Sequence, residues 1–270
     1  MYAARRYRGL GAIVDLGCFV GATTIALAEG LAVNLKAGGN QIHAYDLFRW
    51  NQGYEAWAKG KELEGRFSVS ESFFFEFLAR TAEWRDYIVA HQEDLCDAQW
   101  TGGPIEFLYI DAMKSPKVAT AIASNFFPHL IAGKSSIAHQ DYPHYVTWWI
   151  HILTFRLRDY FSFVADLPQS TLFRLNQPID PDLLASDLSP ATVSPPEIEA
   201  AFDYSLSVVG REKKANVIAA KANAYLARGE LARADDVLKQ SRYGPASMAD
   251  EFNIVKGLVA RKLAGAARLI

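Results

Sequence analysis

The chain has 270 residues, of which 50% are hydrophobic and 21% are charged, and its formal net charge is −2. This composition is typical of a globular protein, and the lack of excess basic charge argues against nucleic acid as a partner. The two cysteines, Cys18 and Cys96, form neither a zinc-binding spacing nor a disulfide framework, so we expect a reducing, cytoplasmic setting. The sequence predicts no membrane helix and no signal peptide.

Residues 12–21, AIVDLGCFVG, combine a short apolar run with two glycines. The run at 13–16 predicts a strand buried on both faces, and residues 22–33 predict a helix. A strand, a glycine turn and a helix make the first unit of a nucleotide-binding α/β sheet. We expect Gly17 and Gly21 to let a ligand approach the backbone where a Cβ would collide, and the helix N-terminus to offer it N–H groups.

The residues of this turn narrow the choice of ligand. The dinucleotide fingerprint G-x-G-x-x-G is absent, which argues against a nicotinamide-dependent oxidoreductase. Asp15, just before the first glycine, would repel a pyrophosphate and suits a ligand that carries an ammonium group. The stretch from Val14 to Gly21 resembles the first motif of class I S-adenosylmethionine-dependent methyltransferases. The resemblance implies that Asp15, Gly17 and Gly21 hold the methionine part of S-adenosylmethionine.

Two further acids follow predicted strands. Residues 41–45 predict the second strand, which leads into Asp46, and a carboxylate there can accept hydrogen bonds from two neighbouring ribose hydroxyls. The methyltransferase resemblance implies this role for Asp46. After a third strand, predicted at 87–90, the same family has an acid that faces the adenine amino group. Asp94 is the best match for that acid, and Glu93 is the alternative.

Residues 47–71 form a long segment that is rich in aromatic residues and glycine. The segment follows a strand end, where ligands bind in open α/β sheets. We expect it either to close over a ligand or to form a separate local cluster. Residues 72–84 then predict a helix with Phe74, Phe77 and Leu78 facing inward.

The most strand-like run, residues 105–110, ends in Asp111, and Lys114 follows at the start of a segment that leads into a helix predicted at 116–127. The two residues resemble the pair in catechol-type O-methyltransferases, in which the acid binds magnesium and the lysine acts as base. Macrocin-type sugar O-methyltransferases also have a metal-binding acid at this strand end. In the macrocin-type pattern a second acid follows two positions later, where this chain has Met113.

Both of these families have two more oxygen ligands after the fifth strand, which we predict at 135–138. Alignment from Gly133 places His139 and Gln140 at the ligand positions, which departs from the pattern. A shift of one residue would instead place Gln140 and Asp141 there, an oxygen pair suited to Mg²⁺.

Three interpretations of this second cluster stay open. In the first, His139, His144 or Lys114 is a metal-free catalytic base. In the second, Asp111 and Asp141 hold Mg²⁺ with help from Gln140. In the third, Asp111 caps the next helix and the histidines are merely hydrogen-bonded.

The rest of the chain completes the predicted fold. A helix at 145–160 carries Trp148 and Trp149, which we expect in the core rather than stacked on a ring ligand, and strands at 161–165 and 171–175 end the sheet. We therefore predict an α/β protein with a Rossmann-like, doubly wound, seven-stranded sheet whose last strand is antiparallel.

We expect three regions along the chain. The predicted sheet domain covers residues 1–177, a linker rich in Pro, Asp and Ser covers 178–196, and a helical tail covers 197–270. The tail has one helix pair that resembles a tetratricopeptide repeat, at 216–228 and 230–241. We expect the tail to pack on the sheet domain, on a second copy in a homodimer, or on a partner.

The function predicted from these motifs is S-adenosylmethionine-dependent methylation of a hydroxyl on a small molecule, a sugar or a secondary metabolite. One alternative is N-methylation of a small amine. Another is a non-catalytic scaffold in which a degenerate cofactor fold carries a helical interaction tail. The presence of Asp15, Asp46 and Asp94 argues against degeneracy.

Overall fold

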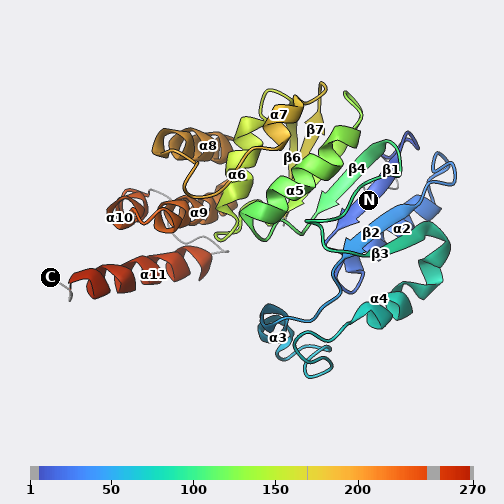
Figure 1. Cartoon of the computed structure of the whole chain (residues 1–270), viewed down its shortest axis with the longest axis horizontal. Coiled ribbons are helices and arrows are strands. Elements are labelled where there is room, and N and C mark those ends of the chain that lie inside the picture. The colour runs from blue at the N-terminus through green and yellow to red at the C-terminus, as the bar shows by residue number, and fades with distance from the viewer. Residues whose placement is uncertain (1–5, 169, 242–249, 268–270) are drawn as a thin grey trace.

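The computed structural model describes residues 6–168, 170–241 and 250–267. Its centre is a seven-stranded sheet in the order β3-β2-β1-β4-β5-β7-β6 (Figure 1). The strands are β1 (Ala12–Leu16), β2 (Ile42–Asp46), β3 (Ile88–Gln92), β4 (Ile105–Ile110), β5 (Ser136–Gln140), β6 (Phe161–Asp166) and β7 (Ser170–Leu175).

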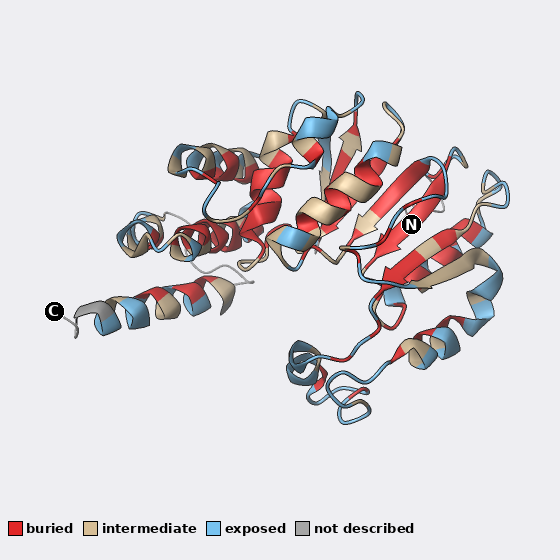
Figure 2. Cartoon of the chain, in the orientation of Figure 1, coloured by how far each residue is buried: buried red, intermediate tan, exposed pale blue. Residues whose placement is uncertain are grey.

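The strand directions confirm the predicted fold class. The pairs β2–β3, β1–β2, β1–β4 and β4–β5 are parallel, whereas β7 is antiparallel to both β5 and β6. Because the crossover connections place helices on both faces, the central strands are buried on both sides. Figure 2 shows this burial along β1 and β4, and every residue of β1 is buried.

Ten α-helices lie in the described part of the chain. They are α2 (Ala22–Ala32), α3 (Gln52–Ala58), α4 (Phe74–Thr81), α5 (Pro116–Phe126), α6 (Trp148–Arg156), α7 (Pro181–Leu184), α8 (Pro195–Val208), α9 (Lys214–Ala227), α10 (Leu231–Lys239) and α11 (Asp250–Ala267). Apolar residues of α2 pack with Ile13 and Ile42 on one face of the sheet, and those of α5 pack with Val14 and Leu108 on the other. The sheet is therefore doubly wound, as predicted. None of the described helices is long and apolar enough to cross a membrane.

Some predicted boundaries were wrong. The helix predicted at 145–160 begins only at Trp148, because residues 141–147 form turns in which the Thr147 hydroxyl donates to the Asp141 carbonyl at 2.8 Å. Leu78 was predicted to face inward, but it is 40% exposed, since α4 buries Phe77 toward the core instead. The third strand continues to Gln92.

The start of α5 excludes one structural role for Asp111. The Ser115 hydroxyl accepts the Val118 N–H, and Pro116 fills the first helical turn. Ser115 is thus the N-cap of α5, and the interpretation of Asp111 as the cap was wrong.

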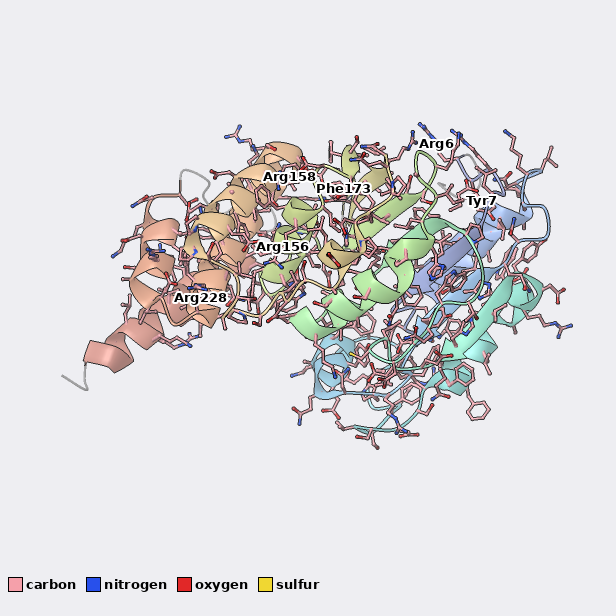
Figure 3. All side chains as sticks on the ribbon, turned by 45° about the horizontal axis from the view of Figure 1, so that its top comes forward. Arg6, Tyr7, Arg156, Arg158, Phe173 and Arg228 are labelled. Carbon is pink, nitrogen blue, oxygen red and sulfur yellow. The ribbon has the colours of Figure 1, made fainter. Side chains whose placement is uncertain are left out.

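The tail helices α8, α9, α10 and α11 lie together at one end of the molecule, beside α6 (Figure 1). Their buried residues belong to the same apolar cluster as α5, α6 and the central strands. The segment 178–196, predicted as a linker, contains α7 and buries Leu184, Leu188 and Val193. Arg156 and Arg228, seen in Figure 3, donate to backbone carbonyls of this segment at 2.8 Å to Asp187 and 2.7 Å to Pro190.

Candidate functional site

Four carboxylates gather at the carboxyl ends of four adjacent strands. Asp15 lies in β1, Asp46 ends β2, Asp111 follows β4 and Asp141 follows β5. The strands are neighbours in the sheet, and the Asp111 N–H donates to the Leu16 carbonyl at 2.8 Å. One edge of the sheet therefore carries a concentration of negative charge, at the position where open α/β sheets bind ligands.

Asp15 is the most deeply buried member of the group, with an exposed fraction of 0%. Its Oδ2 accepts the Thr24 hydroxyl at 2.6 Å, whereas its Oδ1 has no hydrogen-bond partner among the described residues. Burial raises the pKa of Asp15 to about 7, with further increases from Asp111 and Asp46. A buried acceptor without a partner costs free energy, so this oxygen is suited to receive a donor from a ligand.

The two glycines of the turn lie so close to other parts of the chain that an added Cβ would collide with them. A Cβ at Gly17 would lie 2.7 Å from the Asp111 carbonyl oxygen, and one at Gly21 would lie 2.8 Å from the Thr81 methyl group. Both residues also have left-handed backbones, with φ of 87° and 94°. The packing of the chain itself is therefore sufficient to require glycine at both positions. The role of Gly17 and Gly21 in cofactor binding stays a prediction.

Asp46 links the glycine turn to the segment after β2. Its Oδ2 accepts the Phe19 N–H at 2.9 Å, and its Oδ1 accepts the Phe48 N–H at 2.8 Å. Burial raises the pKa of Asp46, while these backbone N–H groups lower it. Each carboxylate oxygen retains acceptor capacity, so the pair can still receive two hydroxyl donors.

The aromatic segment after β2 packs around Phe19 of the glycine turn. The Phe19 ring lies 4.7 Å from Tyr54, 5.4 Å from Trp57 and 5.2 Å from Phe73, measured between ring centroids. Burial raises the pKa of Tyr54, and the nearby Asp46 and Asp111 raise it further, which puts this ring beside the acidic site. The segment is thus a local aromatic cluster that also borders the carboxylates.

The acids after β3 have different environments. The Glu93 N–H donates to the Asp46 carbonyl at 3.1 Å, which ties the two strand ends together. Asp94 is exposed, and its Oδ1 accepts the Cys96 N–H at 2.9 Å. Asp94 therefore stabilises the turn after β3, and its contact with an adenine ring stays a prediction.

Lys114 joins Asp111 and Asp141 into one charged network. Its Nζ donates to Asp111 Oδ1 at 2.5 Å and also donates to Asp141 Oδ2. Partial burial lowers the pKa of Lys114 but the two carboxylates raise it, and the net shift is upward. Burial raises the pKa of Asp111 to about 6, against the opposing effect of Lys114. Lys114 is therefore an ammonium group at neutral pH, and Asp111 titrates unusually close to neutrality.

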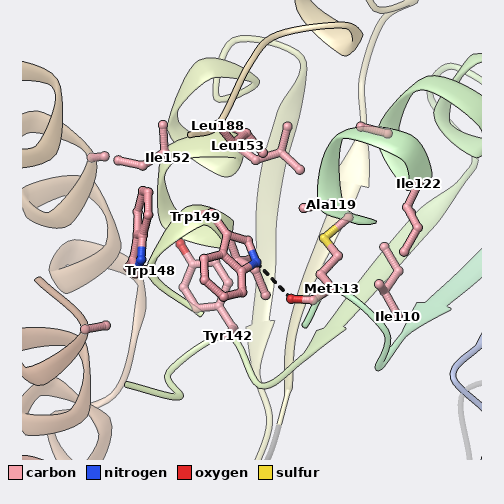
Figure 4. Close-up of a cluster of buried hydrophobic side chains, with 14 of the residues drawn as sticks. Ile110, Met113, Ala119, Ile122, Tyr142, Trp148, Trp149, Ile152, Leu153 and Leu188 are labelled. Atoms are coloured by element: carbon pink, nitrogen blue, oxygen red, sulfur yellow. Dashed lines mark hydrogen bonds between the residues drawn. The ribbon is translucent and has the colours of Figure 1, made fainter. Parts of the chain in front are cut away.

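A side chain of α6 holds the turn between Asp111 and Lys114 in place. Trp149 Nε1–H donates to the Met113 carbonyl at 2.8 Å, and Met113 is itself buried (Figure 4). Trp148 and Trp149 are 3% and 6% exposed. Both tryptophans therefore lie in the core, as predicted, and Trp149 has the added task of holding this turn.

The predicted magnesium ligands already have internal partners. Lys114 lies between Asp111 and Asp141, and the Gln140 amide oxygen accepts the Tyr109 hydroxyl at 2.6 Å. Among the residues that the structure describes, no group of three or more His, Cys, Asp or Glu is arranged to hold a metal ion. The donor set thus fits a lysine-bridged carboxylate pair better than a Mg²⁺ site. Gln140 is the last residue of β5, and Asp141 follows it directly.

His139 does not fit the role of catalytic base. It is 2% exposed and borders a small apolar cavity with Phe127, Leu153 and Phe173. Burial lowers its pKa to about 4, so the neutral ring is a weak proton acceptor near neutral pH. The cause is strand alternation: His139 shares a sheet face with Ile137, which packs into the core.

His144 is likewise engaged on both ring nitrogens. Its Nδ1 accepts the Val146 N–H at 3.3 Å, and its Nε2 lies 3.7 Å from Glu251 of α11. The first contact places the proton of the neutral ring on Nε2, facing Glu251. This geometry does not fit a base that is free to take a proton from a substrate.

Sequence reasoning missed two polar residues of this site. Tyr109 lies next to Asp111, and burial together with Asp111 raises its pKa to about 12. Its place as the penultimate residue of the central strand was a usable signal. Glu251 lies more than a hundred positions further along the chain, and only the packing of the tail brings it to His144.

Comparisons with known proteins add the following findings. No protein-family model matches the sequence, and no curated protein matches it significantly. Among solved structures, the O-methyltransferase NovP is 14% identical with a TM-score of 0.46, over 62% of this chain and 72% of NovP. Phosphoethanolamine N-methyltransferase 1 of Haemonchus contortus is 13% identical with a TM-score of 0.46, over 72% of this chain and 45% of that one.

The 23S rRNA methyltransferase ErmE is 13% identical with a TM-score of 0.34, over 95% of this chain and 93% of ErmE. At these identities and TM-scores, the assignment of the fold rests on the strand order and directions of the sheet itself.

Proposed function

We propose that the chain is an S-adenosylmethionine-dependent methyltransferase that acts on a hydroxyl group of a small molecule. The observation that carries the proposal is the buried Oδ1 of Asp15, which has no partner in the described chain and lies at the carboxyl end of β1. A cationic donor is the ligand that best stabilises a buried carboxylate. The methionine part of S-adenosylmethionine supplies an ammonium group for this position.

The other acids at the carboxyl ends of the strands suit the remaining parts of the same cofactor. We expect Asp46, at the end of β2, to accept hydrogen bonds from the two ribose hydroxyls, and Asp94 or Glu93, after β3, to accept one from the adenine amino group. The four carboxylates of the site exceed the single ammonium of Lys114, so the site favours a sulfonium cofactor over a polyanion. The same excess of negative charge favours a small neutral acceptor over nucleic acid.

The groups that could accept the proton of the acceptor hydroxyl narrow to two carboxylates. His139 is buried, His144 is engaged, and Lys114 is already protonated. The carboxylates of Asp111 and Asp141 remain, and the raised pKa of Asp111 makes it a better proton acceptor than an ordinary aspartate. Bound S-adenosylmethionine would supply the methyl group, and the Asp111–Lys114–Asp141 network would orient the hydroxyl and take its proton as the methyl is transferred.

We propose that this chemistry proceeds without magnesium. The Lys114 ammonium lies between the two carboxylates where a divalent cation would have to bind. Removal of divalent ions with a chelator should therefore leave cofactor binding unchanged.

The test is calorimetric titration of the protein with S-adenosylmethionine and S-adenosylhomocysteine, with magnesium or with chelator. We expect both compounds to bind, with S-adenosylmethionine at least as tight because its sulfonium faces the carboxylates. Asp46→Ala should weaken binding about 10- to 100-fold, the value of one or two charged hydrogen bonds.

Asp86→Ala is the matched control, because Asp86 is an exposed acid that precedes β3, away from the carboxyl ends of the strands. It should bind like the wild type. If neither compound binds to the wild type under any condition, the methyltransferase proposal is wrong and the scaffold alternative becomes the better one.

A further inference from the structure

The loop that carries Asp141 has a conformation that needs support. Residues 141–147 connect β5 to α6, and Asp141 has a φ of 44°, in the left-handed region that few non-glycine residues adopt. Within the loop, the Asp141 carbonyl accepts the His144 N–H at 2.9 Å and the Thr147 hydroxyl at 2.8 Å. Strained backbone of this kind persists where the surroundings hold it in place.

Those surroundings are side chains of the tail. The Tyr145 N–H donates to Glu251 Oε2 of α11 at 2.9 Å, and the Tyr145 carbonyl accepts from Asn223 Nδ2 of α9 at 3.1 Å. The Tyr142 hydroxyl is 2.9 Å from Ser205 Oγ of α8 and is fully buried. Three tail helices thus each contribute one polar anchor to a single short loop.

Glu251 also faces two titratable groups of the loop. Its Oε1 lies 3.7 Å from His144 Nε2, and its carboxylate is close enough to Asp141 for the two charges to interact. By contrast, the hydrogen bonds of Asp15 and Asp46 described above go to residues between positions 19 and 48. In the described part of the chain, these tail anchors therefore reach the loop that carries Asp141, on the Lys114 side of the site.

We propose that Asn223 and Glu251 are positioning residues: they hold the 141–147 loop so that Asp141 stays against Lys114. On this proposal, which rests on the proposed function, the helical tail is part of the methyl-acceptor half of the enzyme. Loosening the tail would impair acceptor turnover while leaving cofactor binding intact.

The test measures the state of Lys114 directly and needs no acceptor. Lysine reactivity is read by competitive labelling with acetic anhydride at pH 8, followed by mass spectrometry, with exposed Lys117 at the start of α5 as internal reference. In Glu251→Ala and Asn223→Ala, release of Asp141 should lower the pKa of Lys114 by about half a unit to one unit. Its labelling rate should then rise about three- to tenfold.

Two variants separate positioning from general loosening. Glu251→Gln keeps an acceptor for the Tyr145 N–H and should restore the slow labelling of the wild type. Glu199→Ala removes a carboxylate of α8 that bonds Lys221 and Tyr225 outside the loop, and should leave Lys114 unchanged.

The outcomes are distinguishable from those of the binding test. Unchanged Lys114 labelling in both alanine variants, or an equal rise in Glu199→Ala, would overturn the positioning proposal. Affinity for S-adenosylhomocysteine, measured in parallel, should match the wild type in every variant. If the wild type does not bind it, the proposed function fails, while the labelling still decides whether the tail holds the loop.

Discussion

A single buried acid makes this protein less stable than its fold allows. The pKa of Asp15 is raised from its ordinary value to about 7, so the native state binds this proton more tightly than the unfolded chain does. Stability therefore falls as pH rises from about 4 to about 7 and stays reduced above that range. On the proposed function, the same ionised carboxylate is the form that would bind the ammonium group of the ligand.

Asp15→Asn should separate these two effects. The amide oxygen can still accept the Thr24 hydroxyl, and the burial of a charge disappears. At pH 8 we expect the variant to be more stable by about 2 to 4 kcal/mol, and at pH 4 to have little advantage. Urea unfolding at the two pH values measures this difference.

The control for this prediction is Asp94→Asn, which alters an exposed acid that caps a turn and should change stability at neither pH. An Asp15→Asn protein that is destabilised equally at both pH values would show that shape, not charge, governs the position. The Asp15→Asn variant should also lose S-adenosylmethionine binding.

Individual residues also mark where sequence reasoning reached its limit. Asp15, Asp46 and Asp111 could be placed at one edge because parallel strands end together, and the sheet confirms that placement. His139 was misjudged because the residues that follow it, Gln140 and Asp141, are polar, whereas the alternation of β5 turns it toward the core. The engagement of His144 could not be predicted, since Glu251 reaches it only through tertiary packing.

At the scale of elements, the glycine turn and α4 fit each other through Gly21. We expect Gly21→Ala to destabilise the protein by more than the 1 to 2 kcal/mol that a left-handed backbone costs, since the new methyl group would also meet Thr81. Thr81→Ser removes the opposing methyl and keeps the hydroxyl that donates to the Phe77 carbonyl. The double variant should recover only the steric part of the loss.

Gly39→Ala isolates the backbone contribution, because Gly39 has a φ of 79° and no neighbouring atom within 4 Å. Chemical denaturation of the four variants and the wild type measures each part. Equal losses in Gly21→Ala and Gly39→Ala would show that α4 yields to the added methyl group.

Element types were predictable and element ends were less so. The apolar run at 105–110 and the proline at 116 located β4 and α5 closely, since local residues decide them. The start of α6 was placed too early, because a hydrogen bond between Thr147 and Asp141 and the tail anchors on Tyr145 hold residues 141–147 in turns. Tertiary contacts of this kind leave no local pattern.

At the scale of the whole molecule, the sheet and the tail share one core. Phe202 of α8 is fully buried in the same cluster as Leu108 of β4. The buried ion pair of Lys213 with Asp166, at 2.6 Å, ties the start of α9 to the β6–β7 hairpin. The whole described chain should therefore unfold cooperatively.

Phe202→Ala tests this coupling, with an expected loss of about 3 to 5 kcal/mol. Hydrogen exchange read by mass spectrometry should show β1, β4, α8 and α9 losing protection together in this variant. If the opening free energy for exchange were lower in α8 and α9 than in the strands, the tail and the sheet would be two independently folding parts.

The anchoring of Tyr145 has a consequence for how such a protein changes over generations. A helical repeat that only recruits partners can be exchanged between genes as a cassette, because nothing else depends on it. Here the backbone N–H and the backbone carbonyl of Tyr145, in the loop that carries Asp141, are both held by tail side chains. Replacing the tail would remove the side chains that hold the loop of Asp141. The tail and the sheet would therefore be inherited together as one unit.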